Sequence, residues 1–369
     1  MNNSIILPSS SLTTKLFNTS NTTSFEGLTT KSGQRNDFLT LAGAISCCTI
    51  VGILFVFGIF ANALTILVVK KSADLKTSAF NVIICSLAFS DFISAWNSPF
   101  AVYRSTFGYR LYYLPTFFCK TTMAFKFWTS CVTIQHILVF TILRIAAIKF
   151  PHRMKIFTVY KAKILVMVIW IETFLANFIF YFWFPYVYSA DEFNPVGVGC
   201  SAHKDQMKYI TIYTNIAFPI FLWSPILTVV LLTFVLICLV IQRKRLRQKD
   251  RGSDVDVSKE NFALLQLSLI LLSFLIGYLP DAGYRLAARI RFENGQKFVE
   301  RQTWILKLSS LLCLRISECL NPIFYNIASS TMRKATKTYV TTKLCFKQTK
   351  QDNNTTNADA PPRSTNKQV

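Results

Sequence analysis

Apolar residues along this chain of 369 residues gather in seven long segments that short polar stretches separate. Each segment approaches or exceeds the roughly 20 residues that an α-helix needs to cross the hydrocarbon layer of a bilayer. We expect membrane spans at residues 41–69, 79–103, 117–148, 163–187, 209–241, 261–287 and 303–326. The pattern therefore predicts an all-α fold, an integral membrane bundle of seven transmembrane helices.

Composition favours a membrane protein over a soluble one. Hydrophobic residues make up 52% of the chain and 33 residues are phenylalanine, a balance that a soluble domain of this length would struggle to bury. The net charge of +22 would suggest nucleic-acid binding in a soluble protein, but the excess of Lys and Arg lies largely beside the span ends. There it attracts anionic lipid, so we expect the lipid bilayer as a partner and no nucleic acid.

Charge also predicts the orientation, because Lys and Arg in short loops favour the cytoplasmic side of a membrane. Basic residues follow spans one, three, five and seven. The N-terminal segment 1–40 is then extracellular at the plasma membrane, and its sequons at Asn2, Asn18 and Asn21 would accept glycans there. No cleaved signal peptide is predicted, since no basic region followed by an apolar stretch opens the chain.

Two of the ten cysteines differ from the others in their position. Cys119 begins span three and Cys200 lies in the second outer loop, so both face an oxidising compartment and can pair. Cys47 and Cys48, near the outer end of span one, are rival partners that spacing does not exclude.

Polar residues and prolines recur at characteristic places within the spans: Asn62, the run Leu87-Ala88-Phe89-Ser90-Asp91, Trp170, Pro280 and the run Asn321-Pro322-Ile323-Phe324-Tyr325. At these positions the chain resembles the rhodopsin-like family of G-protein-coupled receptors, over all seven spans and the short helix beyond them. The resemblance implies an extracellular ligand, a heterotrimeric G protein as partner, and a Cys119–Cys200 disulfide. It also implies a joint at Asn321 and Pro322, where proline frees a backbone carbonyl.

The resemblance extends to residues that repack when such receptors are activated. Pro225, Ile134 and Phe274 match the family's switch, with Pro219 as an alternative span-five proline and plain core packing as the alternative for Ile134 and Phe274. Tyr278 takes the position of the family's span-six tryptophan.

Arg144 departs from the family pattern, because Leu143 precedes it where the family usually has an acid. Glu260, at the position of the family's resting-state partner, is the expected acid for Arg144. The alternative is that both charges are solvated at the membrane edge.

Ionisable residues inside spans are candidates for function, because their burial is costly unless they are paired or hydrated. Lys126 lies about five helical turns before Arg144 and shares its face, at a level that in the family contacts ligand. Basic residues also dominate the outer ends of spans six and seven. The expected ligand-binding residues are Lys126, Arg315, Tyr278, Asp281, Arg285 and Lys307.

This cationic vestibule predicts a ligand with an anionic group, such as an acidic peptide or a carboxylate. The alternatives are that Lys126 pairs with a neighbouring acid, that Arg315 pairs with Glu318 three residues later, and that the loop charges are merely solvated. Asp91 and Glu318 also match the family's sodium pocket, to which Thr133 and Ser317 would add oxygen ligands. A proton shared between the two carboxyl groups is the alternative.

Apolar residues recur at helical spacing among lysines in the segment 327–345, which predicts an amphipathic helix on the inner membrane surface. Cys345 at its end is a palmitoylation site or a free thiol. The tail 346–369 is polar and aperiodic, so we expect it to be disordered and, if phosphorylated, to recruit an arrestin-like desensitiser.

No catalytic constellation and no cofactor motif occurs, so we do not expect an enzyme. A transporter or channel is the competing class, since Asp91, Glu318 and other buried charges would suit an ion path. Within receptors, the stretch from Arg144 to Pro151 is similar to invertebrate FMRFamide-like peptide receptors and to nematode class W serpentine chemoreceptors. A neuropeptide and a small environmental molecule both remain open as ligands.

Overall fold

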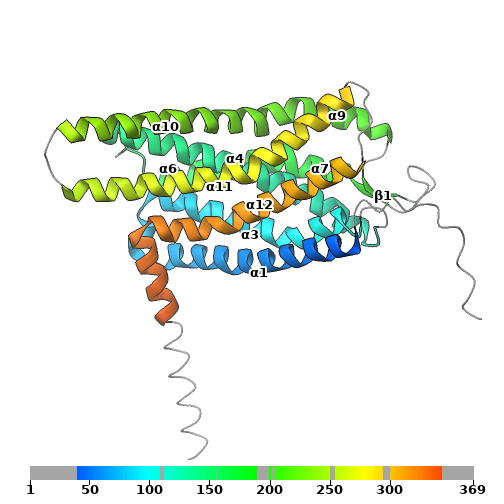
Figure 1. Cartoon of the computed structure of the whole chain (residues 1–369), viewed down its shortest axis with the longest axis horizontal. Helices are drawn as coiled ribbons and strands as arrows, with labels where there is room; N and C mark the ends of the chain where they lie inside the picture. The colour runs from blue at the N-terminus through cyan, green and yellow to red at the C-terminus, as the bar shows by residue number, and fades with distance from the viewer. Residues whose placement is uncertain are drawn as a thin grey trace, which may run out of the picture. The chain divides into compact units, whose positions relative to one another are not determined.

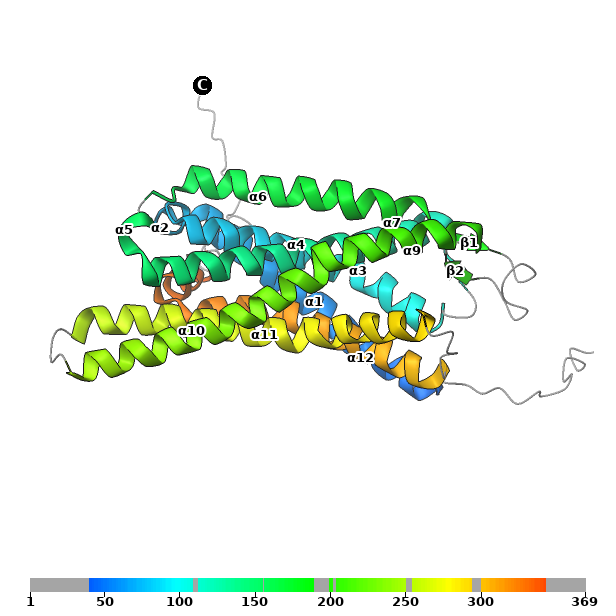
Figure 2. The same cartoon turned by 90° about the horizontal axis from the view of Figure 1, so that it is seen from above.

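The computed structural model describes residues 40–108, 112–154, 156–188, 199–201, 204–249, 254–293 and 300–342. Within these ranges the chain forms seven helical rods that run side by side (Figures 1 and 2). The first three rods are α1 (Leu41–Lys71), α3 (Ala79–Ser105) and α4 (Thr116–Lys149). The fourth is the continuous run of α6 (Val159–Thr173), η1 (Phe174–Phe178) and α7 (Ile179–Trp183). The predicted all-α bundle of seven helices is confirmed.

The last three rods complete the bundle. The fifth is the run of α9 (Lys204–Phe218), η2 (Pro219–Trp223) and α10 (Ser224–Lys249). The sixth and seventh are α11 (Asp254–Glu293) and α12 (Glu300–Ala328), and these two pack along each other. Short helices α2 (Ala73–Lys76) and α5 (Pro151–Met154) follow the first and third rods, and a further helix covers residues 330–342.

The helices extend beyond the apolar segments because charged and polar residues continue the helix outside the hydrocarbon layer. The clearest case is α11, which begins at Asp254 and ends at Glu293 around a predicted span of 261–287. Local capping fixes other ends: the Thr40 side chain accepts from the Gly43 amide at the start of α1, and Thr158 accepts from the Lys161 amide before α6.

Six of the described helical rods are long and apolar enough to cross a membrane. The seventh, α12, spans 29 residues but is less apolar, because it carries Lys307, Arg315 and Glu318. The outer surface of the bundle is lined by large apolar side chains, among them Phe60, which is 71% exposed. Such a surface would be a liability in water and suits contact with lipid.

Two rods contain a single wide π-helical turn, η1 and η2, which the sequence pattern did not predict. Pro219 opens η2 and has no N–H to donate to the preceding turn. In η1 the Tyr213 hydroxyl donates a hydrogen bond to the Ala176 carbonyl. The fifth rod therefore stabilises the bulge in the fourth.

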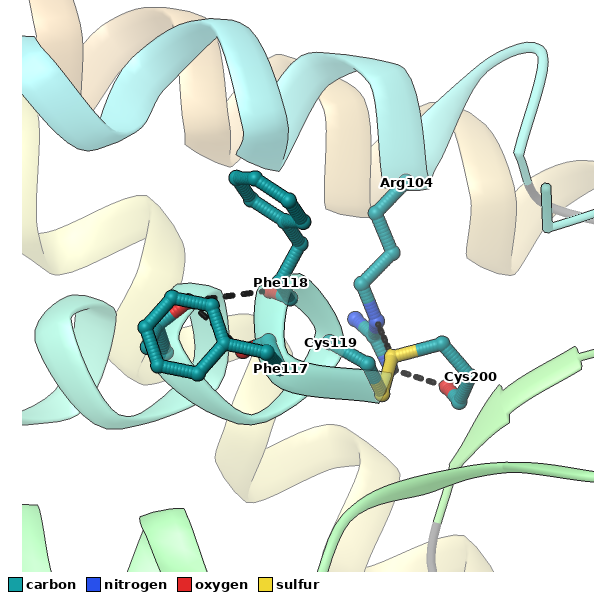
Figure 3. The surroundings of a disulfide bond; sticks show 6 residues. Arg104, Phe117, Phe118, Cys119 and Cys200 are labelled. Carbon is teal, nitrogen blue, oxygen red and sulfur yellow. Dashed lines mark hydrogen bonds between the residues drawn. A yellow bond between two sulfur atoms is a disulfide. The ribbon is translucent and has the colours of Figure 1, made fainter. Parts of the chain in front are cut away.

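A small hairpin and a disulfide cover one end of the bundle. Strands β1 (Tyr186–Tyr188) and β2 (Gly199–Ser201) pair antiparallel, with Val187 opposite Cys200. Cys200 is bonded to Cys119 at the start of α4, whereas Cys47 and Cys48 are free thiols. Arg104 at the end of α3 donates to the Cys200 carbonyl over 2.9 Å (Figure 3). We call this end of the bundle the disulfide end.

The opposite end carries the helix 330–342, and we call it the tail end. Ser329 separates this helix from α12 and caps it, because its hydroxyl accepts from the Met332 amide over 3.2 Å. Met332 is only 1% exposed and belongs to the main core cluster together with Val68, Leu75 and Tyr325. This packing holds the helix at an angle to α12, as the orange segment after α12 shows in Figure 1.

Candidate functional site

A cluster of charged residues lies near the disulfide end, on α4, α11 and α12. Asp281 and Arg285 are four residues apart on one face of α11, and Arg285 Nε donates to Asp281 Oδ2 over 2.6 Å. The second oxygen of Asp281 accepts from the Ser310 hydroxyl of α12 over 3.4 Å. The same Ser310 hydroxyl lies closer to the Lys307 carbonyl, at 2.9 Å, so the ion pair with Arg285 is the stronger of the two contacts of Asp281. We call Lys126, Asp281, Arg285 and Ser310 the ligand-level cluster.

Lys126 on α4 brings an additional positive charge to this cluster. Its charge interacts with the acid Asp281 and with the cations Arg285, Arg104 and Arg315. Among the described residues Lys126 has no hydrogen-bonded partner. Lys307 on α12 adds a further cation, whose charge interacts with those of Arg104 and Lys126. Among the described residues of this region, basic side chains therefore outnumber acidic ones.

Aromatic rings hold Arg285 in place. Its guanidinium lies 4.5 Å from the ring centre of Phe127 and 5.7 Å from that of Phe218, within the range of cation–π attraction. Tyr181 also stacks on Phe127, with ring centres 3.7 Å apart. Sequence analysis did not select these three rings, although Phe127 directly follows Lys126. Their convergence depends on how α4, α7 and α9 pack.

Arg315 belongs to a second cluster, deeper in the bundle. Its guanidinium donates to Glu318 Oε2 over 2.6 Å and to the Ser94 hydroxyl, and Ser94 donates to Glu318 Oε1 over 2.8 Å. Arg315 and Glu318 are each 2% exposed. The structure thus contains the Arg315–Glu318 ion pair given above as an alternative. It places Arg315 with α3 instead of with the ligand-level cluster.

Asp91 lies beside this pair, where the sodium site was predicted. Its Oδ2 accepts from Asn321 over 2.8 Å, and its buried Oδ1 has no hydrogen-bond partner among the described residues, so Oδ1 fits a cation or a proton. Thr133 shares a hydrogen bond with Ser90 and its side chain also interacts with Asp91, whereas Ser317 bonds to Ser273 on α11. Asp91 is therefore a candidate ligand for a sodium ion, whereas the Ser317 hydroxyl is bonded to α11. The role of sodium stays a prediction.

Three of the predicted switch residues, Ile134, Phe274 and Pro225, are buried inside the bundle. Ile134 and Phe274 are buried in the main core cluster, and Pro225 at the start of α10 is also buried. The ring of Phe274 stacks on that of Tyr278 with centres 4.8 Å apart. The hydroxyl groups of Tyr278 and Tyr325 are buried and have no hydrogen-bond partner in the described part of the chain.

Arg144 packs against aromatic rings near the tail end. Its guanidinium lies 4.1 Å from the ring centre of Phe80 on α3 and 5.1 Å from that of Phe140 on its own helix. Sequence analysis looked for an acidic partner and missed these contacts. The side chain of Glu260 lies outside the described part of the chain, so the Arg144–Glu260 pair stays a prediction.

Other predicted sites also fall outside the described residues. These are the sequons at Asn2, Asn18 and Asn21, the thiol of Cys345, and the tail from residue 346 onward.

The fold, the disulfide and the polar positions within the spans agree with a comparison to known proteins. The family model described as "7 transmembrane receptor (rhodopsin family)" matches residues 61–325. The chain belongs to this family. It is therefore a multi-pass membrane receptor of the G-protein-coupled class, and not an enzyme.

Several characterised relatives are similar along most of their length. The human growth hormone secretagogue receptor type 1 is 27% identical over 301 residues, which cover 80% of each chain. The pig receptor of the same name is 26% identical over 313 residues, again 80% of each chain. The neuromedin U receptor homolog nmur-2 of Caenorhabditis elegans is 25% identical over 314 residues, or 78% of this chain and 77% of the relative.

Proposed function

We propose that this receptor binds an extracellular ligand with an anionic group, a peptide being the favoured class, and activates heterotrimeric G proteins in response. The observation that carries the proposal is Lys126, which lies among cations and beside an Asp281 whose oxygens are already bonded to Arg285 and Ser310. A ligand carboxylate would supply the missing negative charge.

Two kinds of similarity bear on the peptide class. The stretch from Arg144 to Pro151 resembles both FMRFamide-like peptide receptors and nematode class W serpentine chemoreceptors, so by itself it does not separate a peptide from a small molecule. Among the relatives, one is named as a receptor homolog for neuromedin U and others as growth hormone secretagogue receptors. None of these names fixes the ligand of this chain.

The orientation proposed for the receptor places the disulfide end outside the cell. Basic residues in the loops at the tail end support it, since such loops favour the cytoplasm. A disulfide at the other end supports it as well, since disulfides persist in oxidising compartments. A ligand arriving from outside would then meet Lys307 and Arg104 before it reaches Lys126.

Arg285 has the geometry of a preorganised anion contact. Its side chain is nearly buried, clamped by Asp281 and packed on Phe127, so little rotamer freedom remains to be lost on binding. Guanidinium groups hold carboxylates through paired hydrogen bonds, and the ring of Phe127 would pack beside the ligand. Lys126 would act as the neighbouring point charge.

For activation we propose the family's route. Ligand binding would repack Phe274 against Ile134 and Pro225, bend α12 at Pro322, and release Arg144 from a resting contact with Glu260 for engagement by a G protein. The aromatic contacts with Phe80 and Phe140 would help to hold Arg144 in the resting state.

Signalling in cultured cells tests the proposal. The intact chain would be expressed with a panel of G proteins and exposed to acidic peptides, neutral peptides of equal length and small organic acids. Activation by an acidic peptide and none by its neutralised counterpart would support the proposal. Surface expression with ligand-dependent ion flux and no G-protein signal would contradict it in favour of a channel or transporter.

A further inference from the structure

Hydrogen-bond donors outnumber acceptors around the ligand-level cluster. Lys126 has three N–H donors, and none of them has a hydrogen-bond partner among the described residues. Arg285 has five, of which only Nε is bonded in this part of the chain, to Asp281 over 2.6 Å. The Tyr181 hydroxyl is buried and also has no partner within the described ranges. Buried donors in proteins are normally bonded, so this set calls for an acceptor.

The ring of Phe127 brings these donors together. The Arg285 guanidinium lies 4.5 Å from the centre of this ring, and Tyr181 stacks on it with ring centres 3.7 Å apart. Lys126 is the neighbouring residue on α4, and its charge interacts with that of Arg285. Arg285 also interacts electrostatically with the Tyr181 hydroxyl. Donors from α4, α7 and α11 therefore converge around one ring.

The charge balance of this region calls for a monovalent anion. Asp281 neutralises Arg285 in their ion pair, so the described residues leave the ammonium of Lys126 uncompensated. Arg104 adds positive potential, because its charge also acts on Lys126. A charge inside a membrane bundle is costly unless it is paired or hydrated, and a small anion would pair it. A doubly charged anion would overcompensate one ammonium.

We propose that Lys126, Arg285 and Tyr181 form a chloride site. The ammonium and the guanidinium supply positive charge, and the phenolic hydroxyl donates a hydrogen bond to the ion. Chloride is the abundant small monovalent anion outside cells, and this end of the bundle faces the outside under the orientation proposed above.

Chloride binding depends on these three donors and not on the class of the receptor's ligand. One consequence does rest on the proposed function. A ligand carboxylate at Arg285 would have to displace the ion, so chloride would lower the potency of an acidic ligand.

Two other ways of satisfying the donors differ in what they predict. A neutral, deprotonated Lys126 would need no anion, so the receptor would not respond to chloride. A water molecule at Tyr181 would satisfy its hydroxyl without any charge, so loss of the hydroxyl would leave a response to chloride unchanged.

Thermal unfolding at constant sodium concentration and ionic strength tests the site. The purified full-length receptor would be heated without ligand while sodium chloride replaces sodium methanesulfonate, whose anion is larger. The constant sodium keeps any effect at Asp91 unchanged. We expect the melting temperature of the wild type to rise by about 2–4 °C and then to saturate, as ion binding to the folded state requires.

Two variants remove one donor group each. Lys126→Gln should abolish the rise in melting temperature. Tyr181→Phe should raise the half-saturating chloride concentration about tenfold, because it removes one hydrogen bond to a charged group. Lys120→Gln, on the same helix as Lys126, and Tyr209→Phe, on an exposed face of α9, are matched controls that should respond as the wild type does.

A wild-type melting temperature that does not change with chloride would overturn the proposal. So would an equal rise in Lys126→Gln, which would indicate a general effect of salt, or an unchanged half-saturating concentration in Tyr181→Phe. If Lys126→Gln fails to fold, the wild type and Tyr181→Phe still decide. No signalling ligand enters these measurements, so their failure is distinct from a failure of the receptor to respond to acidic peptides.

Discussion

At the scale of single residues, two buried ion pairs in the described part of the receptor differ in their surroundings. The pair of Asp281 and Arg285 lies beside an additional cation, Lys126, whereas both members of the Arg315–Glu318 pair bond to the hydroxyl of Ser94, and only the Arg315 Nε lacks a hydrogen-bond partner among the described residues. An open charge cluster suits an incoming anion, and a closed one suits the support of the helix bundle. The surroundings of an ion pair therefore distinguish a binding role from a structural role better than the mere presence of a charged residue in a span does.

The closed pair leads to a prediction about stability. Glu318→Gln should lower the stability of the purified receptor by about 3–5 kcal/mol, because it leaves the buried charge of Arg315 without its counterion. Glu172→Gln, an exposed acid on α6, should change stability by less than about 0.5 kcal/mol. Thermal unfolding of the two variants in one detergent provides the comparison, and equal melting temperatures would contradict the structural role of the pair.

Replacement of the whole pair should cost less than breaking it. Arg315→Met combined with Glu318→Leu removes both charges at once, and such exchanges of buried pairs are often neutral or stabilising. We expect the double variant to melt closer to the wild type than Glu318→Gln does. A double variant that melts below Glu318→Gln would contradict this expectation.

Sequence spacing was enough to anticipate part of this residue-scale chemistry. Arg315 and Glu318 are three apart, so their pairing follows from helix geometry alone. The contribution of Ser94 depends on how α3 packs against α12, and the rings around Arg285 come from three different rods. No local pattern encodes such contacts, which is why sequence analysis missed them.

At the scale of elements, the apolar segments predicted all seven rods because a membrane span must satisfy its backbone internally and cover a fixed thickness. The wide turns η1 and η2 were not predictable in this way, since a π-helical turn needs one extra residue and a partner for its backbone. For η1 that partner is Tyr213.

Tyr213→Phe tests this element-scale contact. Loss of the hydroxyl leaves the Ala176 carbonyl without its side-chain donor, so stability should fall by about 1–3 kcal/mol. Tyr209→Phe, on an exposed face of the same helix, is the matched control and should melt like the wild type. Hydrogen exchange in η1 should increase only in Tyr213→Phe, and an equal increase in both variants would argue against a specific role for this bond.

At the scale of the whole molecule, the receptor combines a lipid-facing exterior with a charged interior that is divided into levels. The disulfide between Cys119 and Cys200 fastens the hairpin over the disulfide end, above the ligand-level cluster. The pairing was correctly implied by family resemblance, while cysteine positions alone left Cys47 and Cys48 open as partners.

The disulfide should matter for binding more than the free thiols do. We expect Cys119→Ser to reduce surface expression and ligand response together, because the hairpin loses its attachment to α4. Cys47→Ser, which removes a free thiol, should leave both unchanged. Cell-surface labelling beside a G-protein assay measures the two effects, and a normal response from Cys119→Ser would show that the hairpin does not shape the site.

The most direct test of the central claim is the effect of the charge at position 126 on signalling. Concentration–response curves would be recorded for an activating acidic peptide and for its neutralised counterpart, on the wild type, on Lys126→Glu and on the control Lys120→Gln of the same helix. We expect Lys126→Glu to abolish or strongly weaken the response to the acidic peptide at normal surface expression, while Lys120→Gln behaves like the wild type. Equal potency of the acidic peptide on Lys126→Glu and the wild type would contradict an anionic ligand at this site.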